Sequence, residues 1–365
     1  MIKPMPPSTP SASPSVAATP IPIAGPNASP STAITRAPSA NPQGPIALVL
    51  PTRSTDFARA AEAVRAGVTA ARDALSPQRE LRVFESDGSR PSTLEAYRAA
   101  NTANAAAIIG PLTRSEVQWV GAELKPTVPT IALNTFDGVP PNNFYTLSLA
   151  VDNEARQIAL VAYEEARAND PAQTPTALVV TTASPLHKRA AQNFAEAFSA
   201  AGGRVLEMLE APSEGPIVVA PRIQSAQPSL VFVALPPARA GALNAALRTV
   251  PMYGTSSLNA VGERLAMIDL EGVRLVDAPW LLVHNDSELA RFARPDVQVR
   301  YTPEIERLYA LGVDALRLAL ELSAGRNAIE LSGATGTLSV MGPRVERRAR
   351  TATVRNGEAV PDERP

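Results

Sequence analysis

The chain has 365 residues and a formal net charge of −1 at pH 7, with 45% hydrophobic residues and no cysteine. This length accommodates about two domains, and a charge near zero excludes the strongly basic surface that is typical of nucleic-acid-binding proteins. The lack of cysteine excludes disulfides, thiolate catalysis, cysteine metal sites and a lipid-bearing cysteine in the chain as given.

No stretch approaches the ~18 apolar residues of a membrane span, and the N-terminus lacks the apolar core of a signal peptide. We therefore expect a soluble chain. Residues 1–44 consist mainly of Pro, Ala, Ser and Thr, with Lys3 and Arg36 as the only charges. This composition predicts a disordered, polyproline-like tether. The alternative is the remnant of a leader sequence.

The first part of the ordered chain alternates strands with helices. The pattern predicts strands at 46–50, 81–84, 106–109 and 130–133, with helices at 57–75, 92–101 and after Thr113. Such alternation is typical of right-handed βαβ units with a parallel sheet.

One junction in this layer has a clear local signature. Gly110-Pro111 ends the third strand, and Thr113 and Glu116 have the spacing of a capping box at a helix N-terminus. In a parallel sheet this junction lies at the carboxyl edge, where free amides face a crevice. The alternative is an ordinary βα loop without a ligand.

A second layer repeats the alternation. Strands are predicted at 176–180, 204–209, 230–234, 252–253 and 273–276, and helices at 152–168, 185–201 and 237–247. A helix at 303–322 follows, and Gly312 on its inward face predicts close helix packing. The last part changes to short antiparallel strands, with a turn at Asn356-Gly357.

These patterns predict the fold class: two doubly wound, three-layer α/β lobes with a ligand cleft between their carboxyl edges. Loops at strand ends supply hydroxyls, amides and guanidinium groups that could hold a small anion or zwitterion. The candidate ligand residues are Arg53, Ser54, Thr113, Arg114, Asn134, Thr135, Phe136, Ser184, His187, Ser256 and Ser257. Helix capping and turn formation use the same residue types and are the alternative for each of them.

The motifs of common enzymes are missing. The chain has no G-x-G-x-x-G after its first strand, no P-loop and no G-x-S-x-G elbow. His187 and His284 are far apart in the sequence and have no H-x-x-x-H partner. We therefore expect no catalytic residues, no metal and no cofactor.

Several stretches together resemble a known family. They are the first strand and its helix from Pro45, residues 107–112 (Ala-Ile-Ile-Gly-Pro-Leu), 129–134 (Pro-Thr-Ile-Ala-Leu-Asn), 277–282 (Asp-Ala-Pro-Trp-Leu-Leu), 312–315 (Gly-Val-Asp-Ala) and 331–338 (Leu-Ser-Gly-Ala-Thr-Gly-Thr-Leu). In this order they resemble the LppC/LpoA family, whose members carry a type I periplasmic-binding-protein-like domain. The resemblance covers residues 45 to 360.

The resemblance implies a function and a domain organisation. LpoA-like proteins are non-enzymatic outer-membrane lipoproteins that face the periplasm and activate a class A penicillin-binding protein in peptidoglycan synthesis. Contact with a membrane would then need a lipid anchor that this chain lacks. The fold implies discontinuous lobes, with residues 45–148 and 277–328 in lobe 1, and residues 149–276 and 329–360 in lobe 2. Fuller family members add an N-terminal helical-repeat domain, where this chain has the proline-rich segment.

A second hypothesis is a solute-binding receptor of an ABC transporter for an amino acid or similar small ligand, because the same fold serves both roles. Receptors of this kind hold the amino-acid carboxylate and ammonium with a Ser/Thr run in one lobe and acidic or aromatic groups opposite. Here Arg114 and Phe136 occupy the first-lobe edge, and no acidic partner is evident in the second-lobe loops. The sequence therefore predicts no tight amino-acid binding. An enzyme, the third hypothesis, lacks any catalytic constellation.

Overall fold

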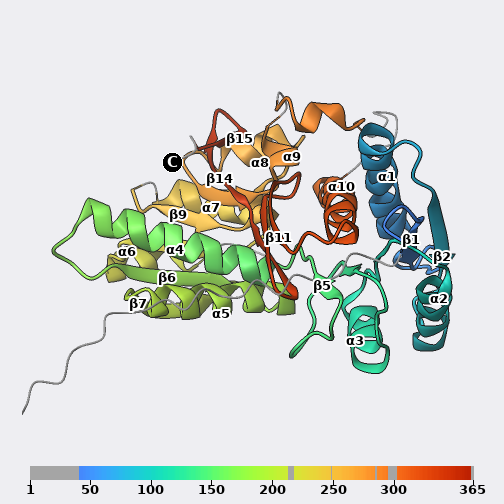
Figure 1. The fold of residues 1–365 in the computed structure, drawn as a ribbon. Coiled ribbons are helices and arrows are strands. Elements are labelled where there is room, and N and C mark those ends of the chain that lie inside the picture. The colour runs from blue at the N-terminus through green and yellow to red at the C-terminus, as the bar shows by residue number, and fades with distance from the viewer. Residues whose placement is uncertain (1–40, 213–217, 248, 284–285, 295–301, 363–365) are drawn as a thin grey trace, which may run out of the picture. The chain divides into compact units, whose positions relative to one another are not determined.

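The computed structural model describes residues 41–212, 218–247, 249–283, 286–294 and 302–362, which form two mixed sheets with helices on their faces (Figure 1). Most of the predicted tether lies outside these residues, and so does His284. Residues 41–44 form a turn, in which Arg79 Nη1 donates to the carbonyls of Pro42 and Gly44, both at 2.8 Å. The prediction of a tether up to residue 44 was therefore wrong for these last residues, which are bound to the folded chain.

The first sheet has eight strands in the order β11-β12-β13-β5-β4-β3-β1-β2. Strands β1 to β5 pair in parallel, whereas β11, β12 and β13 form an antiparallel extension that joins β5 through β13. The strands are β1 (Ile46–Leu50), β2 (Leu81–Glu85), β3 (Ala107–Ile109), β4 (Thr130–Ala132), β5 (Phe144–Thr146), β11 (Ala328–Ser332), β12 (Thr337–Met341) and β13 (Arg344–Arg348).

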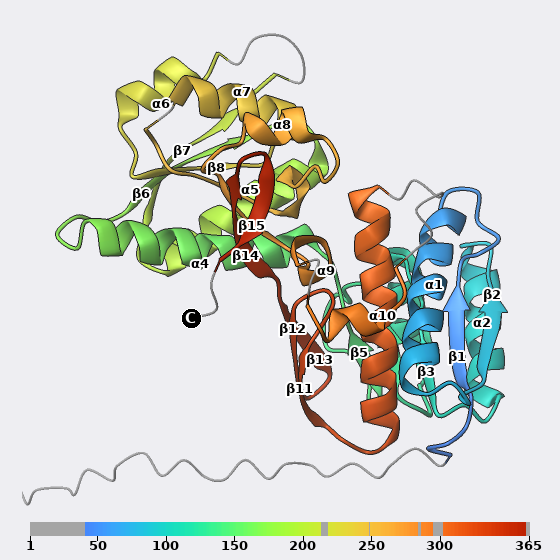
Figure 2. The same cartoon turned by 90° about the horizontal axis from the view of Figure 1, so that it is seen from above.

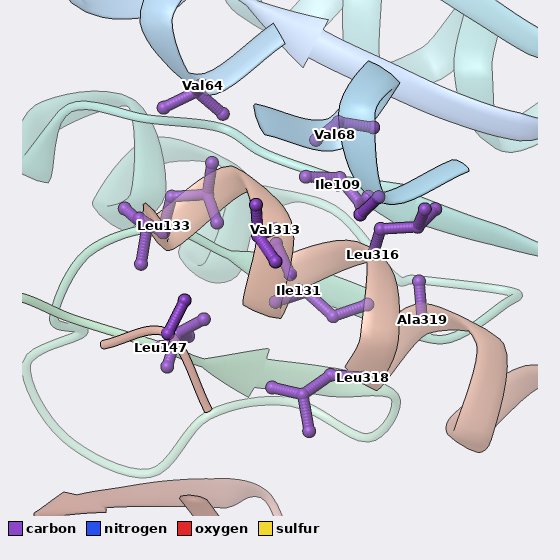
Figure 3. Packing of buried hydrophobic residues seen from close by; sticks show 14 of the residues in the cluster. Val64, Val68, Ile109, Ile131, Leu133, Leu147, Val313, Leu316, Leu318 and Ala319 are labelled. Carbon is purple, nitrogen blue, oxygen red and sulfur yellow. The ribbon is translucent and has the colours of Figure 1, made fainter. Parts of the chain in front are cut away.

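Helices cover both faces of the parallel part of this sheet. One face packs against α1 (Ala58–Leu75) and α10 (Pro303–Ser323), and the other packs against α2 (Arg90–Thr102) and α3 (Arg114–Glu123). Every residue of β1 is buried, as expected for a parallel strand between two helical layers. Figure 3 shows the core on the first face, where Val64 and Val68 of α1 and Val313 and Leu316 of α10 meet the strands.

The second sheet has seven strands in the order β15-β14-β10-β9-β8-β6-β7. Strands β6 to β10 pair in parallel, and β14 and β15 add an antiparallel hairpin. The strands are β6 (Thr176–Thr181), β7 (Arg204–Glu210), β8 (Leu230–Val233), β9 (Met252–Gly254), β10 (Arg274–Asp277), β14 (Arg350–Arg355) and β15 (Glu358–Pro361).

Helices also pack on both faces of the second sheet. Helices α4 (Val151–Asn169) and α5 (Pro185–Ala200) lie on one face, and α6 (Ala220–Ala226), α7 (Pro237–Leu247) and α8 (Arg264–Ile268) lie on the other (Figure 2). Three short helices connect the larger elements: η1 (Ser256–Leu258), α9 (Pro279–Leu282) and η2 (Leu289–Arg291). The predicted α/β class with three-layer sheets is confirmed.

The strand assignment differs from the predicted division in the C-terminal part. Residues 329–360 were expected with the second lobe, but β11 to β13 belong to the first sheet, and only β14 and β15 join the second. The chain passes from one sheet to the other at Ala349, between β13 and β14. Alternation and turn residues predict strands, whereas the sheet that a strand joins is set by non-local pairing, here of Arg344 in β13 with Thr146 in β5. The division into two lobes itself stays a prediction.

Three local predictions are confirmed. The capping box is present: the Glu116 amide donates to Thr113 Oγ1 at 3.3 Å, and the Thr113 amide donates to Glu116 Oε2 at 3.0 Å. The last hairpin turns at Asn356 and Gly357, whose φ values of 54° and 80° are those of a type I′ turn. Gly312 is indeed a site of close packing, since a Cβ there would lie 2.2 Å from the carbonyl oxygen of Val64 on α1.

Candidate functional site

The predicted ligand residues lie at the carboxyl ends of parallel strands, as their positions in the sequence suggested. Arg53 and Ser54 follow β1, and the residues from 113 to 136 follow β3 and β4 in the first sheet. Ser184 and His187 follow β6, and Ser256 and Ser257 follow β9 in the second sheet. The contacts of these side chains show which groups could still bind a ligand.

The side chains of the two candidate residues after β1 form hydrogen bonds with neighbouring parts of the protein. Arg53 Nη2 donates to the carbonyl of Glu85 and to the hydroxyl of Ser92, both at 3.3 Å. Ser54 Oγ accepts from the amide of Phe57 at 3.3 Å, at the entrance to α1. Both side chains therefore have a structural partner in the protein itself.

The structure brings together the two predicted loops after β3 and β4. Arg114 and Asp137 form an exposed ion pair of 2.8 Å, and Asn134 Nδ2 donates to the carbonyl of Leu112 at 3.1 Å. Thr135 donates its amide to Asn134 Oδ1 at 3.0 Å. The Phe136 ring packs edge-on against Phe144, with ring centroids 6.0 Å apart. This loop pair is therefore held by its own contacts.

His187 and Ser184 converge on Thr182, a residue that the sequence analysis did not single out. The Thr182 hydroxyl lies 2.8 Å from His187 Nδ1 and accepts from the Ser184 amide at 3.1 Å. Partial burial lowers the pKa of His187, because desolvation disfavours the charged imidazolium. The hydroxyl that accepts from Ser184 can donate its own proton to Nδ1, which suits a neutral ring.

Ser256 is held in an ionic network. Its hydroxyl donates to Glu154 Oε2 at 2.6 Å, its amide donates to the same oxygen at 3.2 Å, and its carbonyl accepts from Arg307 Nη2 at 2.8 Å. The neighbouring Ser257 hydroxyl contacts that of Thr255 at 2.9 Å. The hydroxyl of Ser256 is therefore committed to a buried carboxylate.

The network continues from Ser256 to Asp277 at the end of β10. Arg307 of α10 binds the fully buried Asp277 carboxylate in a bidentate manner, with Nε to Oδ1 at 2.7 Å and Nη2 to Oδ2 at 2.8 Å. Asn259 Nδ2 donates to Asp277 Oδ2 at 2.7 Å. Burial alone would lower the pKa of Arg307, but the charge and hydrogen bonds of Asp277 raise it, so the guanidinium stays charged.

On the other side of Ser256 the network reaches β13. Arg347 donates from Nη2 to Glu154 Oε1 at 2.9 Å, from Nε to the carbonyl of Ser148 at 2.9 Å, and from Nη1 to the carbonyl of Thr335 at 3.0 Å. Glu154 and Arg347 are buried, at 3% and 6% exposure.

The Thr335 amide and hydroxyl in turn bind Asp314 Oδ2 at 2.7 and 2.6 Å. Two charge pairs join the two sheets and their helices. Arg307 of α10 pairs with Asp277 of β10, and Arg347 of β13 pairs with Glu154 of α4. A buried network with its partners satisfied favours one arrangement of the packed elements.

Local sequence patterns did not indicate this network. Glu154, Asp277, Arg307 and Arg347 come from four separate elements, so no local spacing brings them together. A signal did exist for Arg347, because it is two residues after the inward Val345 on β13 and therefore lies on the same, core-facing side of the strand. Within the described residues, no group of three or more His, Asp or Glu side chains is arranged to hold a metal ion.

A pocket of about 460 Å³ lies between α4 and the strands β12 and β13. Its lining residues are Asn153, Arg156, Gln157, Leu160, Ser339, Met341, Arg344, Val345, Glu346, Arg347 and Arg348, and none of the predicted ligand residues is among them. The predicted ligand site between the strand ends stays a prediction.

Comparisons with known proteins fit this arrangement. The profile of the family described as "LppC putative lipoprotein" matches residues 229–357. A solved structure described as a "putative branched-chain amino acid ABC transporter" from Chromobacterium violaceum is 33% identical, over 85% of this chain and 99% of that chain, with a TM-score of 0.71. No curated protein sequence matches the chain.

Two structures from Haemophilus influenzae share the fold at lower identity. The LpoA C-domain, described as a regulator of PBP1A, is 20% identical over 88% of this chain and all of that chain, with a TM-score of 0.68. Full-length LpoA is 19% identical with a TM-score of 0.69, and the match spans 59% of its length.

Two sheets flanked by helices and joined by crossing segments define a protein with the type I periplasmic-binding-protein-like fold. Over residues 229–357 the chain matches the LppC family, and it shares its fold with the LpoA C-domain.

Proposed function

We propose that this protein is a non-enzymatic periplasmic regulator that binds a class A penicillin-binding protein and activates it in peptidoglycan synthesis. The match of the LppC family profile to residues 229–357 carries this proposal. The similarity to the LpoA C-domain, described as a regulator of PBP1A, supports it through the fold.

The contacts at the strand ends support recognition of a partner over capture of a small solute. Thr113, Arg114 and Ser256, which could have held an amino acid, are engaged with Glu116, Asp137 and Glu154 instead. A solute would have to compete with these bonds, and the net gain from exchanging one hydrogen bond for another is small. The Arg307–Asp277 and Arg347–Glu154 pairs also tie the elements of the two sheets together.

The proposed place of action is the periplasm, with attachment to the outer membrane through a lipid outside this chain. Among the described residues, no helix combines the length and apolar character that crossing a bilayer requires. The lipid anchor is part of the proposal because the family resemblance implies one.

The test is a glycan-polymerisation and crosslinking assay with the purified class A synthase of the same organism. We expect addition of the chain to raise the rate of one or both reactions several-fold, saturating at the concentration that saturates direct binding. The control is a solute receptor of the same fold, added at equal concentration. Saturable binding without any change in rate would contradict activation, and no binding at micromolar concentrations would contradict the whole proposal.

A solute-binding receptor of an ABC transporter is the second candidate, and the 33% identity to the Chromobacterium violaceum protein favours it. A thermal-shift screen with branched-chain amino acids separates the two functions. A ligand at a hundred to a thousand times its dissociation constant adds about 3–4 kcal/mol to the stability of the folded state. We expect no such rise in melting temperature; a clear rise with leucine, isoleucine or valine would favour the receptor.

A further inference from the structure

The pocket between α4 and β13 has the form of a groove with two different walls. On α4, Asn153, Arg156, Gln157 and Leu160 follow helical spacing and line one wall. The other wall is the β12–β13 hairpin, from which residues 344–348 line the pocket. Figures 1 and 2 both show α4 beside the end of this antiparallel extension.

The walls are held together by hydrogen bonds at the base of the groove. The Gln157 side chain donates from Nε2 to the carbonyl of Ala349 at 2.7 Å and accepts from the Ala349 amide at 2.9 Å. Arg347 leaves β13 on the core side to reach Glu154 of α4. The groove is therefore built on two fixed elements rather than on loops.

Two arginines of the groove, Arg156 and Arg344, have neutral partners. Arg156 donates to the side-chain oxygens of Asn153 and Asn193, and Arg344 donates to the carbonyl of Gly138 at 3.4 Å. In the part of the chain that the structure describes, neither guanidinium forms an ion pair.

Arg348 pairs with Glu346 at 3.8 Å, but both side chains are largely exposed, so this pair is weak. Guanidinium groups with neutral partners can still form bidentate, charge-assisted bonds with an incoming carboxylate.

Apolar side chains lie between these charges. Met341 is 78% exposed and Leu160 is 49% exposed, and both line the groove. Met341 pairs directly with Arg344 across the hairpin. A flexible methionine on a binding surface adapts to different apolar side chains.

Arg344 and Arg348 are four residues apart on one strand, which places them about 13 Å apart. A single small anion could contact only one of these two arginines, whereas an extended chain could reach both.

We propose that this groove binds an extended acidic segment of a partner protein, with carboxylates on Arg156, Arg344 and Arg348 and an apolar side chain against Met341 and Leu160. The inference deepens the proposed function and rests on it for the partner, which is the class A synthase.

Two probes test the proposal by calorimetry or surface-based binding with the full chain. The first is the purified class A synthase, and the second is a six-residue peptide of alternating glutamate and leucine, compared with the same peptide carrying lysine for glutamate. The charge-reversal variant is Arg156→Glu with Arg344→Glu. Ser339→Trp is the second variant, because it fills the groove and leaves every charge in place. Arg98→Glu on α2, an exposed site, is the control for a charge reversal outside the groove.

We expect both groove variants to weaken binding of the synthase and of the glutamate peptide at least tenfold, with Arg98→Glu within twofold of the wild type and melting curves unchanged. If the synthase still binds both groove variants, the groove is not its binding site, and the proposed function is unaffected. Groove-dependent binding of the glutamate peptide without any synthase binding would remove the proposed function and keep the groove as an acidic-segment site. Displacement of the peptide by inorganic phosphate at equal concentration, or equal binding of the lysine peptide, would overturn the acidic protein segment as the occupant.

Discussion

Arg347 and Glu154 form an ion pair of 2.9 Å between β13 of the first sheet and α4 on the second, although the two residues are 193 positions apart in the sequence. The side chains are 2% and 4% exposed. Water therefore does little to screen this pair, and each charge depends on the other for its compensation.

Removing one member of this pair should destabilise the fold strongly. We expect Arg347→Ala or Glu154→Ala to lower the free energy of unfolding by about 3–5 kcal/mol, because each leaves an uncompensated buried charge. Urea unfolding followed by circular dichroism measures this. Arg348→Ala is the matched control on the same strand, since its pair with Glu346 is exposed, and it should change stability by at most about 0.5 kcal/mol. Equal losses of unfolding free energy for the variants at 347 and 348 would contradict a buried ion pair at Arg347.

Ser256 distinguishes a structural role from a ligand role. Ser256→Ala removes the 2.6 Å hydrogen bond to Glu154, a charged and buried acceptor, and should cost about 1–3 kcal/mol of stability. Ser257→Ala removes only a bond between two hydroxyls and should cost about 1 kcal/mol or less. Chemical denaturation of both variants gives the comparison. A Ser256 variant as stable as the wild type would return this hydroxyl to the set of possible ligand groups.

The contact between α1 and α10 depends on two glycines that face each other's helix. A Cβ on Gly312 would lie 2.2 Å from the Val64 carbonyl oxygen, and a Cβ on Gly67 would lie 2.0 Å from that of Tyr309. Gly312→Ala should therefore destabilise the fold by about 1–3 kcal/mol through overpacking. A Gly-to-Ala change inside a helix normally stabilises it by about 1 kcal/mol. The direction in which Gly312→Ala shifts the melting temperature therefore distinguishes overpacking from helix propensity. A rise in melting temperature would show that the helices do not approach so closely.

The sequence predicted what depends on neighbours along the chain. The capping box of Thr113 and Glu116 needs only residues three apart, and the turn at Asn356-Gly357 needs only residues that tolerate positive φ. Gly312 was also informative, because a glycine on the apolar face of a long helix has no other use there than close approach.

What the sequence did not predict depends on distant partners. Arg307 lies on α10, and only the position of Asp277 at the end of β10 makes its burial favourable. The strands at residues 329–348 were expected in the other lobe, because a strand shows no preference for a sheet until its neighbour is known. The predicted ligand residues are a similar case. Their types suit binding and capping equally, and the contacts of Thr113, Arg114 and Ser256 are with the protein itself.

His187 should make stability depend on pH in the mildly acidic range. Its pKa in the folded protein lies below the ordinary value of 6.5 because partial burial disfavours the imidazolium, so the unfolded chain binds this proton more tightly. The stabilising contribution is complete above pH 6.5 and is lost as the pH falls through the ordinary value toward the folded pKa. Protonation also places a hydrogen on Nδ1, so the Thr182 hydroxyl could then only accept from the ring and would have to direct its own hydrogen elsewhere.

The measurement is the melting temperature at pH 7.5 and pH 5.0 for the wild type and for His187→Gln, which cannot titrate. We expect the melting temperature to fall further between pH 7.5 and pH 5.0 for the wild type than for the variant. His284 is present in both proteins and cancels in the difference. An equal fall in melting temperature for the wild type and the variant would mean that His187 is solvated in the folded state, and that the hydrogen bond to Thr182 does not hold the neutral ring.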